Sequence, residues 1–207
     1  MKSIAIFFGL AFLSVSGCVD FSPMPDPSRF FTLTPLPQTE QLHARSTDKT
    51  NGLVVGIAPI RFPGYLDREQ IVTRVAQNRL NILENDRWAE PLEENFTRVF
   101  AQNLGVLLGG ASVIRYPWQK SQRPTWQIEM EVLRFEPSAD QQVELLAHWT
   151  LIEHGNKTRP VFKQTRLARR TLTKSTEASV TGLSEVLGDL SREIADTILA
   201  KFRTDDR

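Results

Sequence analysis

The chain of 207 residues contains a single cysteine, Cys18, which directly follows a short apolar segment near the N-terminus. Lys2 supplies a positive charge, and residues 4–15 are all apolar or small. This layout is typical of a secretory signal peptide, and those twelve residues would rise only about 18 Å as a helix, too little to span a bilayer. We therefore expect residues 1–17 to be removed by cleavage between Gly17 and Cys18.

The sequence Val15-Ser16-Gly17-Cys18 also fits a lipobox, the motif in which a diacylglycerol group is attached to the cysteine thiol. Cys18 would then be the first, acylated residue of the mature protein. Because acylation consumes the only thiol of the chain, no disulfide bond can stabilise the fold, and a hydrophobic core must do so. Residues 19–28 hold three prolines, so residues 18–28 are expected to form a lipidated cysteine and a Pro-rich tether.

The size and charge of the mature chain narrow the class of protein. Removal of 17 residues from 207 leaves 190, enough for one domain with a sizeable core. Without Lys2, the chain carries 24 basic residues (25 − 1) against 24 acidic ones. This balance argues against nucleic acid as a partner, because a phosphate backbone requires a basic surface. We expect one domain over residues 29–203 and a short tail over residues 204–207.

Hydrophobic periodicity predicts two hairpins and several further strands. Residues 71–75 and 80–83 are short apolar runs separated by a polar turn, as in a hairpin. Apolar and polar side chains alternate over residues 126–132 and again over residues 143–151, as in half-buried strands. Trp126 and Trp149 fall on the apolar positions, so we expect both side chains in the core. The alternation shifts near Arg134, where we expect a β-bulge or a twist. Further short strands are expected at residues 30–33, 53–58, 111–116 and 161–172.

Two segments, residues 92–108 and 180–202, have the three- and four-residue apolar spacing of amphipathic helices. Asp86 could cap the first helix, and Gly109 would end it. The order of strands, helix, strands and helix favours a single α+β domain. We expect a mainly antiparallel or mixed sheet with two long amphipathic helices packed on one face.

The chain offers little that points to catalysis. Its three histidines, His43, His148 and His154, lack the spacing of a helical metal pair, and no nucleophile-elbow, P-loop or dinucleotide-binding motif occurs. The adjacent acids Glu93 and Glu94 would point apart on a helix and are interpreted as charged surface. We therefore expect a protein that is not an enzyme and that has no metal site and no cofactor.

Candidate partner-binding residues lie in two places. The turn at residues 64–70 contains Tyr65, Leu66, Asp67 and Arg68, an apolar pair beside two charges. The apolar pair either contacts a partner or caps the core of the sheet. Trp88 precedes the first helix, where it either packs against the helix entry as a hydrophobic staple or lines a groove.

Four segments, together with the lipobox, carry a resemblance to a known family. They are FFTL (residues 30–33), VGIAP (55–59), PGYLDREQIVTR (63–74) and RWAEPL (87–92). In these segments the chain resembles the PqiC/YmbA lipoproteins, also described as ABC-type transport auxiliary lipoproteins. The resemblance extends over nearly the whole mature chain, and its Tyr-Leu-Asp-Arg and Trp-Ala-Glu-Pro-Leu parts are the most specific. One departure is Phe30, where the family often has tyrosine.

The resemblance implies a non-enzymatic component that works with MCE-domain (mammalian cell entry) proteins, which build tunnels that carry lipids between the inner and outer membranes. The expected partner is a PqiB-like tunnel protein, and some family members form rings, so a homo-oligomer is a second candidate assembly. Residue two of the mature chain is Val19, not the aspartate that retains lipoproteins in the inner membrane. The expected location is therefore the outer membrane, facing the periplasm. An alternative is an envelope-assembly lipoprotein of another class, such as a peptidoglycan synthase activator or an outer-membrane protein chaperone.

Replacement of the expected acylation site tests the anchor. The variant Cys18→Ser has no thiol to alkylate, so we expect it to incorporate no labelled palmitate and to accumulate as uncleaved or mislocalised protein. Metabolic labelling followed by immunoprecipitation measures both effects. Unchanged labelling of the variant would refute the assignment of Cys18.

Overall fold

The computed structural model describes residues 26–40, 50, 52–109, 111–119, 122–155 and 159–205. The expected signal peptide, Gly17, Cys18 and His43 lie outside these residues. The elements are β1 (Arg29–Phe31), η1 (Gln38–Glu40), β2 (Val54–Ile57), β3 (Gln70–Ala76), β4 (Arg79–Trp88), α2 (Leu92–Leu107), β5 (Ser112–Arg115), β6 (Trp126–Pro137), β7 (Gln142–Glu153), β8 (Val161–Arg170) and α3 (Thr176–Asp205). This set of elements confirms the predicted α+β class.

The larger sheet has five strands in the order β5-β2-β6-β7-β8. β2 is parallel to both β5 and β6, whereas β7 is antiparallel to both of its neighbours, β6 and β8. In the predicted hairpin of β6 and β7, Met130 pairs with Trp149, and the register shifts between Val132 and Arg134. This register shift confirms the predicted irregularity near Arg134 and favours a bulge over a twist.

A smaller sheet, β1-β4-β3, was not predicted, since the sequence analysis expected a single sheet. Its β3–β4 hairpin is the predicted one, and Val72 pairs with Ile82. β1 adds to the far end of β4 in parallel, with Phe31 opposite Trp88. The two partners are 57 residues apart, and periodicity along the chain carries no information about such a pairing.

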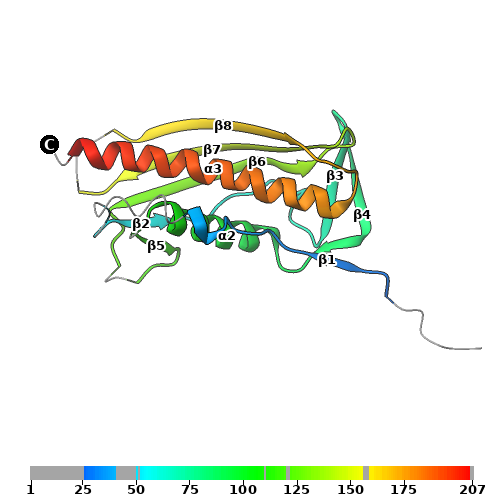
Figure 1. The fold of residues 1–207 in the computed structure, drawn as a ribbon, viewed down its shortest axis with the longest axis horizontal. Coiled ribbons are helices and arrows are strands. Elements are labelled where there is room, and N and C mark those ends of the chain that lie inside the picture. Colours follow the sequence, from blue (N-terminus) through cyan, green and yellow to red (C-terminus); the bar gives the residue numbers. More distant parts are fainter. Residues whose placement is uncertain are drawn as a thin grey trace, which may run out of the picture.

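Both helices cover one face of the large sheet, as predicted (Figure 1). α3 runs along β7 and β8, and α2 lies beside it toward β5. The residues of α3 that face the core recur at helical spacing: Leu183, Leu187, Leu190, Ile194 and Ile198 are all fully buried. Trp126 and Trp149 lie on the same face of the sheet as this core and are buried, which confirms their predicted role.

Phe96 of α2 is central to the core. Its ring is fully buried and makes edge-to-face contacts with Phe62 (5.2 Å between centroids) and Phe135 (5.1 Å). These contacts join the helix to the bulged part of β6 and to the segment that follows β2. Such aromatic pairs add stability beyond the area that they bury.

Residues 32–36 form an extended segment, which we call the strap, that lies against both helices. Its backbone N–H groups donate to helix side chains: Leu33 to Asn95 Oδ1 (3.3 Å), Thr34 to Ser184 Oγ (3.1 Å) and Leu36 to Asn103 Oδ1 (2.8 Å). These side chains replace the strand partner that the strap lacks. The strap therefore determines where the N-terminal tether leaves the domain.

Truncation of the central aromatic ring tests this description of the core. We expect Phe96→Ala to lower the free energy of unfolding by about 3–5 kcal/mol, because it leaves a cavity between the helix and the sheet. Urea unfolding followed by circular dichroism measures the loss. Phe162→Ala is the control, because Phe162 is 75% exposed and its truncation should change stability by only about 0.5 kcal/mol. Equal losses in both variants would contradict the assignment of Phe96 to the core.

Candidate functional site

The surface around the beginning of α2 gathers most of the residues that the sequence analysis singled out. β4 ends at Trp88 and α2 begins at Leu92, so their connection is short. The backbone N–H of Trp88 donates to the carbonyl oxygen of Glu69 (2.7 Å), and that of Ala89 donates to the carbonyl oxygen of Phe31 (2.8 Å). These bonds hold the connection between β1 and the turn that precedes β3.

The start of α2 differs from the prediction. Pro91 occupies the N-cap position and makes no side-chain cap hydrogen bond. Asp86, the predicted cap, lies within β4, where its buried carboxylate accepts two hydrogen bonds from Arg29 (2.7 and 2.8 Å) and another from the Thr176 hydroxyl. The prediction was wrong because β4 continues for several residues beyond the expected end of the strand.

A groove of about 350 Å³ opens beside this connection, and we call it the Trp88 groove. Trp88 itself is 6% exposed and packs into the core, whereas Phe30 is 64% exposed. An exposed ring beside a buried one leaves apolar surface that a partner side chain can cover. The lining residues are Phe30, Asp67, Arg68, Glu69, Trp88, Ala89, Glu90, Pro91 and Leu92.

Charged side chains surround the apolar part of the Trp88 groove. Glu69 forms an ion pair with Arg87 (3.6 Å), and Arg68 Nε donates to the backbone carbonyl of Tyr65 (3.1 Å). Asp67 and Arg68 are both exposed. The rim therefore carries both signs of charge around an aromatic centre, which is the usual composition of a protein-binding patch.

The turn that carries Asp67 and Arg68 is supported from beneath by a polar network. The hydroxyl of Tyr65 donates to Glu136 Oε2 (2.8 Å), and Arg74 Nε donates to Glu136 Oε1 (2.7 Å). The carboxylate of Glu136 is almost completely buried, and the Arg74 guanidinium lies 5.7 Å from the centre of the Tyr65 ring. Burial, followed by the Glu136 carboxylate, raises the pKa of Tyr65 far above its ordinary range. The network holds the turn in one position against β6.

The structure separates the five predicted partner-binding residues into two groups. Asp67, Arg68 and Trp88 come together around the Trp88 groove. Tyr65 enters the polar network, and Leu66 is buried in the core at 4% exposure. Of the two interpretations of the Tyr65–Leu66 pair, the structure supports capping of the core. Trp88 fits parts of both interpretations, because it is buried in the core and also lines the groove.

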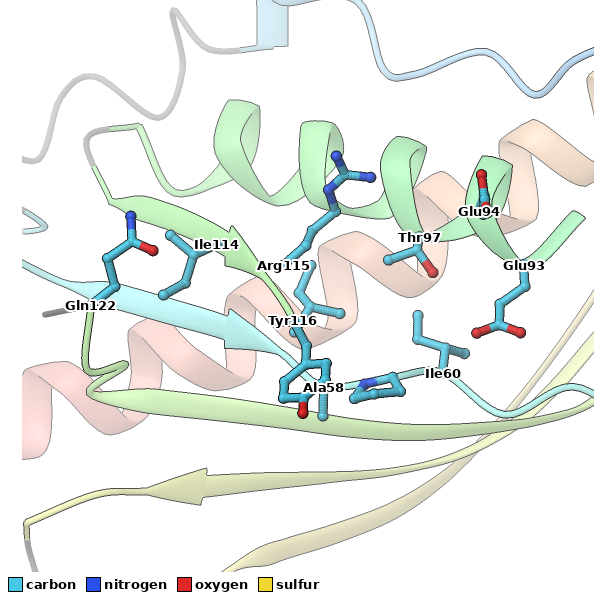
Figure 2. A pocket seen from close by; sticks show the side chains of 11 residues that line it. Ala58, Ile60, Glu93, Glu94, Thr97, Ile114, Arg115, Tyr116 and Gln122 are labelled. Carbon is cyan, nitrogen blue, oxygen red and sulfur yellow. The ribbon is translucent and has the colours of Figure 1, made fainter. Parts of the chain in front are cut away.

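A second depression, of about 550 Å³, lies on the other side of the α2 N-terminus, between the ends of β2 and β5. Figure 2 shows Arg115 extending from β5 toward α2, while Glu93 extends from the first turn of α2 toward Ile60. Burial and the negative charges of Asp67 and Glu94 raise the pKa of Glu93. Because Asp67 also lines the Trp88 groove, the two depressions flank the same end of α2.

Histidines and acids of the described chain are dispersed. His148 Nε2 lies 2.9 Å from Gln164 Oε1, and His154 Nε2 lies 2.9 Å from Gln127 Oε1, both in exposed pairs. Within the residues that the structure describes, no group of three or more His, Cys, Asp or Glu side chains is arranged to hold a metal ion. Neither helix of the described chain has the length and apolar character needed to cross a bilayer.

Two solved structures share this fold. One is the crystal structure of an uncharacterized protein, with 19% sequence identity, a TM-score of 0.68 and coverage of 83% of this chain and 98% of that chain. The other is protein XCC0632 from Xanthomonas campestris, with 15% identity, a TM-score of 0.66 and coverage of 86% and 99%. At these identities the likeness shows the fold alone. A comparison with curated proteins found no match.

A comparison with protein-family models gives the class of protein. Residues 31–195 match the family described as the ABC-type transport auxiliary lipoprotein component. This match covers most of the chain, so the protein belongs to this family of auxiliary transport lipoproteins. The resemblance to the PqiC/YmbA lipoproteins is thereby confirmed.

Phe30 and Glu136 also contribute to this surface, and neither was predicted as a site residue. Phe30 was assigned only to a strand, although an aromatic residue in a three-residue edge strand has little sheet on which to be buried. Glu136 stands at the apolar end of β6, where a carboxylate requires a buried cation. Its partner Arg74 is 62 residues away, so the pairing had no local signal.

Removal of the Tyr65 hydroxyl tests the network through its pH dependence. At pH 7 we expect Tyr65→Phe to lose about 1–2 kcal/mol of stability, because a hydrogen bond to a buried carboxylate is removed. The folded state holds the phenol proton more tightly than the unfolded state, so this contribution is fully present below pH 10.0, the ordinary pKa of tyrosine, and is lost as the pH rises further. The difference in unfolding free energy between the wild type and Tyr65→Phe should therefore shrink above pH 10.0. A constant difference between pH 7 and pH 11 would contradict this account.

Proposed function

We propose that the protein is an outer-membrane lipoprotein that docks the tunnel protein of an MCE-type lipid transport system. The family supports the coarser part of this function, an auxiliary role in ABC-type transport. The finer part, a PqiB-like partner, is supported by the segments 63–74 and 87–92 that carry the most specific resemblance. Both segments contribute to the walls of the Trp88 groove. This convergence is the observation that favours the groove as the partner contact.

The groove has the chemistry of a protein interface. Interfaces combine a desolvated aromatic centre with a polar rim, and aromatic residues dominate the binding energy. Here Phe30 and Trp88 form the centre, and Asp67, Arg68 and Glu90 stand on the rim. The backbone hydrogen bonds of Trp88 and Ala89 fix the groove in place before a partner arrives, which lowers the entropy cost of binding.

The proposed location follows from the mature N-terminus. Cys18 carries the acyl chains in this proposal, and Val19 in second position favours release to the outer membrane. One acyl chain gives only marginal binding, whereas two or more hold a protein firmly on a bilayer. A tether of about ten residues reaches about 30 Å at most when extended. The domain is thus confined to a thin layer beside its membrane, where the end of a tunnel could meet it.

We also propose that the protein acts by binding and not by catalysis. The absence of nucleophile and phosphate-binding motifs from the sequence supports this view. His148 and His154 are exposed and pair with the side-chain amides of Gln164 and Gln127. These pairs also favour a binding role, since a catalytic histidine is usually oriented by a buried acid or carbonyl group.

A charge placed in the groove tests the proposed contact. We expect Phe30→Asp to reduce recovery of the MCE-domain protein about tenfold or more, because the substitution puts a carboxylate in the apolar centre of the interface. Recovery is measured by affinity purification from detergent extracts after crosslinking. The exposure of Phe30 means that the variant should fold as the wild type does.

Phe162→Asp is the matched control, because Phe162 is equally aromatic, is 75% exposed and lies outside the groove. It should recover the partner at the level of the wild type. Equal recovery with both variants would exclude the Trp88 groove as the contact. Failure of the wild type to recover any MCE-domain protein would overturn the proposed function itself.

Gel filtration of the same samples would show whether copies of the chain assemble into a homo-oligomer.

A further inference from the structure

The loop between β8 and α3 presents a leucine to solvent. Leu172 was predicted to end a strand, but β8 ends at Arg170, and Leu172 is 98% exposed. No other large apolar residue of the described chain is exposed to this extent. Transfer of a leucine side chain out of water lowers the free energy, so Leu172 can contact an apolar surface outside the domain.

Hydrogen bonds on both sides keep Leu172 in this position. The N–H of Thr171 donates to the carbonyl oxygen of Gln141 (2.8 Å), and the Thr171 hydroxyl donates to the carbonyl oxygen of Thr173 (2.8 Å). On the helix side, the N–H of Ala178 donates to Ser175 Oγ (3.1 Å), which caps α3. The loop is therefore held at both ends, and its form directs Leu172 outward.

This loop lies at the end of the domain where the tether leaves. Arg29, near the first described residue, forms an ion pair with Glu177 in the first turn of α3 (3.2 Å). Arg29 also binds Asp86, which in turn accepts a hydrogen bond from Thr176. Figure 1 shows the N-terminal segment and the junction of β8 and α3 at the same end of the molecule, opposite the C-terminus.

The length of the tether then limits how far this end can stand from a membrane. Eight residue steps separate Cys18 from Asp26, a span of about 28 Å at most when fully extended. An acyl group on Cys18 would therefore hold the N-terminal end of the described chain within about 28 Å of the bilayer, and the loop that carries Leu172 lies at this end of the domain. The opposite end of β8 lies about ten residues, or about 30 Å, further along the strand.

The charges beside Leu172 also suit a membrane surface. Arg170 and Lys174 flank it and are exposed, and in the described chain neither forms an ion pair with a carboxylate. The neighbouring Arg169, by contrast, is bound by Asp189 (2.6 Å) and Glu185 (3.2 Å). An apolar side chain between two unpaired cations is the composition of segments that rest at the headgroup level of a bilayer.

We propose that residues 170–174 form a second contact with the membrane that holds the acyl anchor. Leu172 enters the headgroup region of the phospholipid bilayer, and Arg170 and Lys174 bind lipid phosphates there. One leucine and two cations bind too weakly to attach the domain alone, but they orient a domain that the anchor already holds. This inference rests on acylation of Cys18, and it requires no protein partner.

A fluorescent label on the loop tests the proposal. Acylated protein carries no free thiol, so Leu172→Cys gives a single site for an environment-sensitive NBD label. Phe162→Cys is the matched control, because Phe162 is also exposed and lies at the opposite end of β8. Both acylated proteins are inserted into vesicles of phosphatidylethanolamine and phosphatidylglycerol that contain a lipid spin-labelled near its headgroup.

We expect several-fold stronger quenching of the label at position 172 than at position 162, with a blue shift of its emission. If both labels emit as in water and are equally accessible to aqueous iodide, the loop does not touch the membrane and the proposal is overturned. Equal quenching of both labels would also overturn it, because the contact would not be specific to this end. Protein that fails to sediment with the vesicles would refute acylation of Cys18, on which the proposal rests. Because no sample contains the MCE partner, the result does not depend on the proposed protein contact.

Discussion

The hydrogen bonds of the strap are the constraint on which the organisation of the molecule depends. An extended segment that crosses two helices has no strand to pair with, and buried backbone N–H groups without partners are costly. Asn95, Asn103 and Ser184 supply the missing acceptors from two helices. Packing reinforces this arrangement, because Leu36 lies so close to Gly188 that a Cβ there would approach it to 2.8 Å. The N-terminal part of the domain is thus bound to both α2 and α3.

This constraint brings several features to the same end of the molecule. With the strap bound to the helices, β1 can pair with the end of β4, and Phe30 reaches the Trp88 groove. Arg29 then meets Asp86 and the first turn of α3. The start of the described chain, the proposed partner groove and the exposed loop at Leu172 are therefore arranged around the ion pair and hydrogen bonds of Arg29, Asp86 and Thr176. Under the proposed membrane contact of residues 170–174, the partner groove lies at the end of the domain nearest the membrane.

Structural features that depend on only a few neighbouring residues were predictable from the sequence. Alternation placed Trp126 and Trp149 in the core, and its shift near Arg134 predicted a bulge or a twist at the point where the register shifts. Helical spacing identified both long helices, because burial on one face of a helix or strand repeats with the period of that element. Features that depend on pairing across the chain were not. Asp86 was assigned as a helix cap because acids are common there, but its partners are Arg29 and Thr176, 57 and 90 residues away. The small sheet was missed for the same reason.

The sequence by itself determined that the chain has one thiol, no disulfide and two amphipathic helices. It also showed which side chains of the strands face the core, since all of these features follow from composition and from the spacing of apolar residues along the chain. It also carried the family, because specific segments such as residues 87–92 are contiguous in the chain. Only the tertiary structure decided that Tyr65 and Leu66 support a turn while Asp67, Arg68 and Trp88 line a groove with Phe30. The physical reason is that burial and pairing depend on neighbours in space. The residues that bury Leu66 and neutralise Arg74 come from other strands and helices, so no pattern along the chain predicts them.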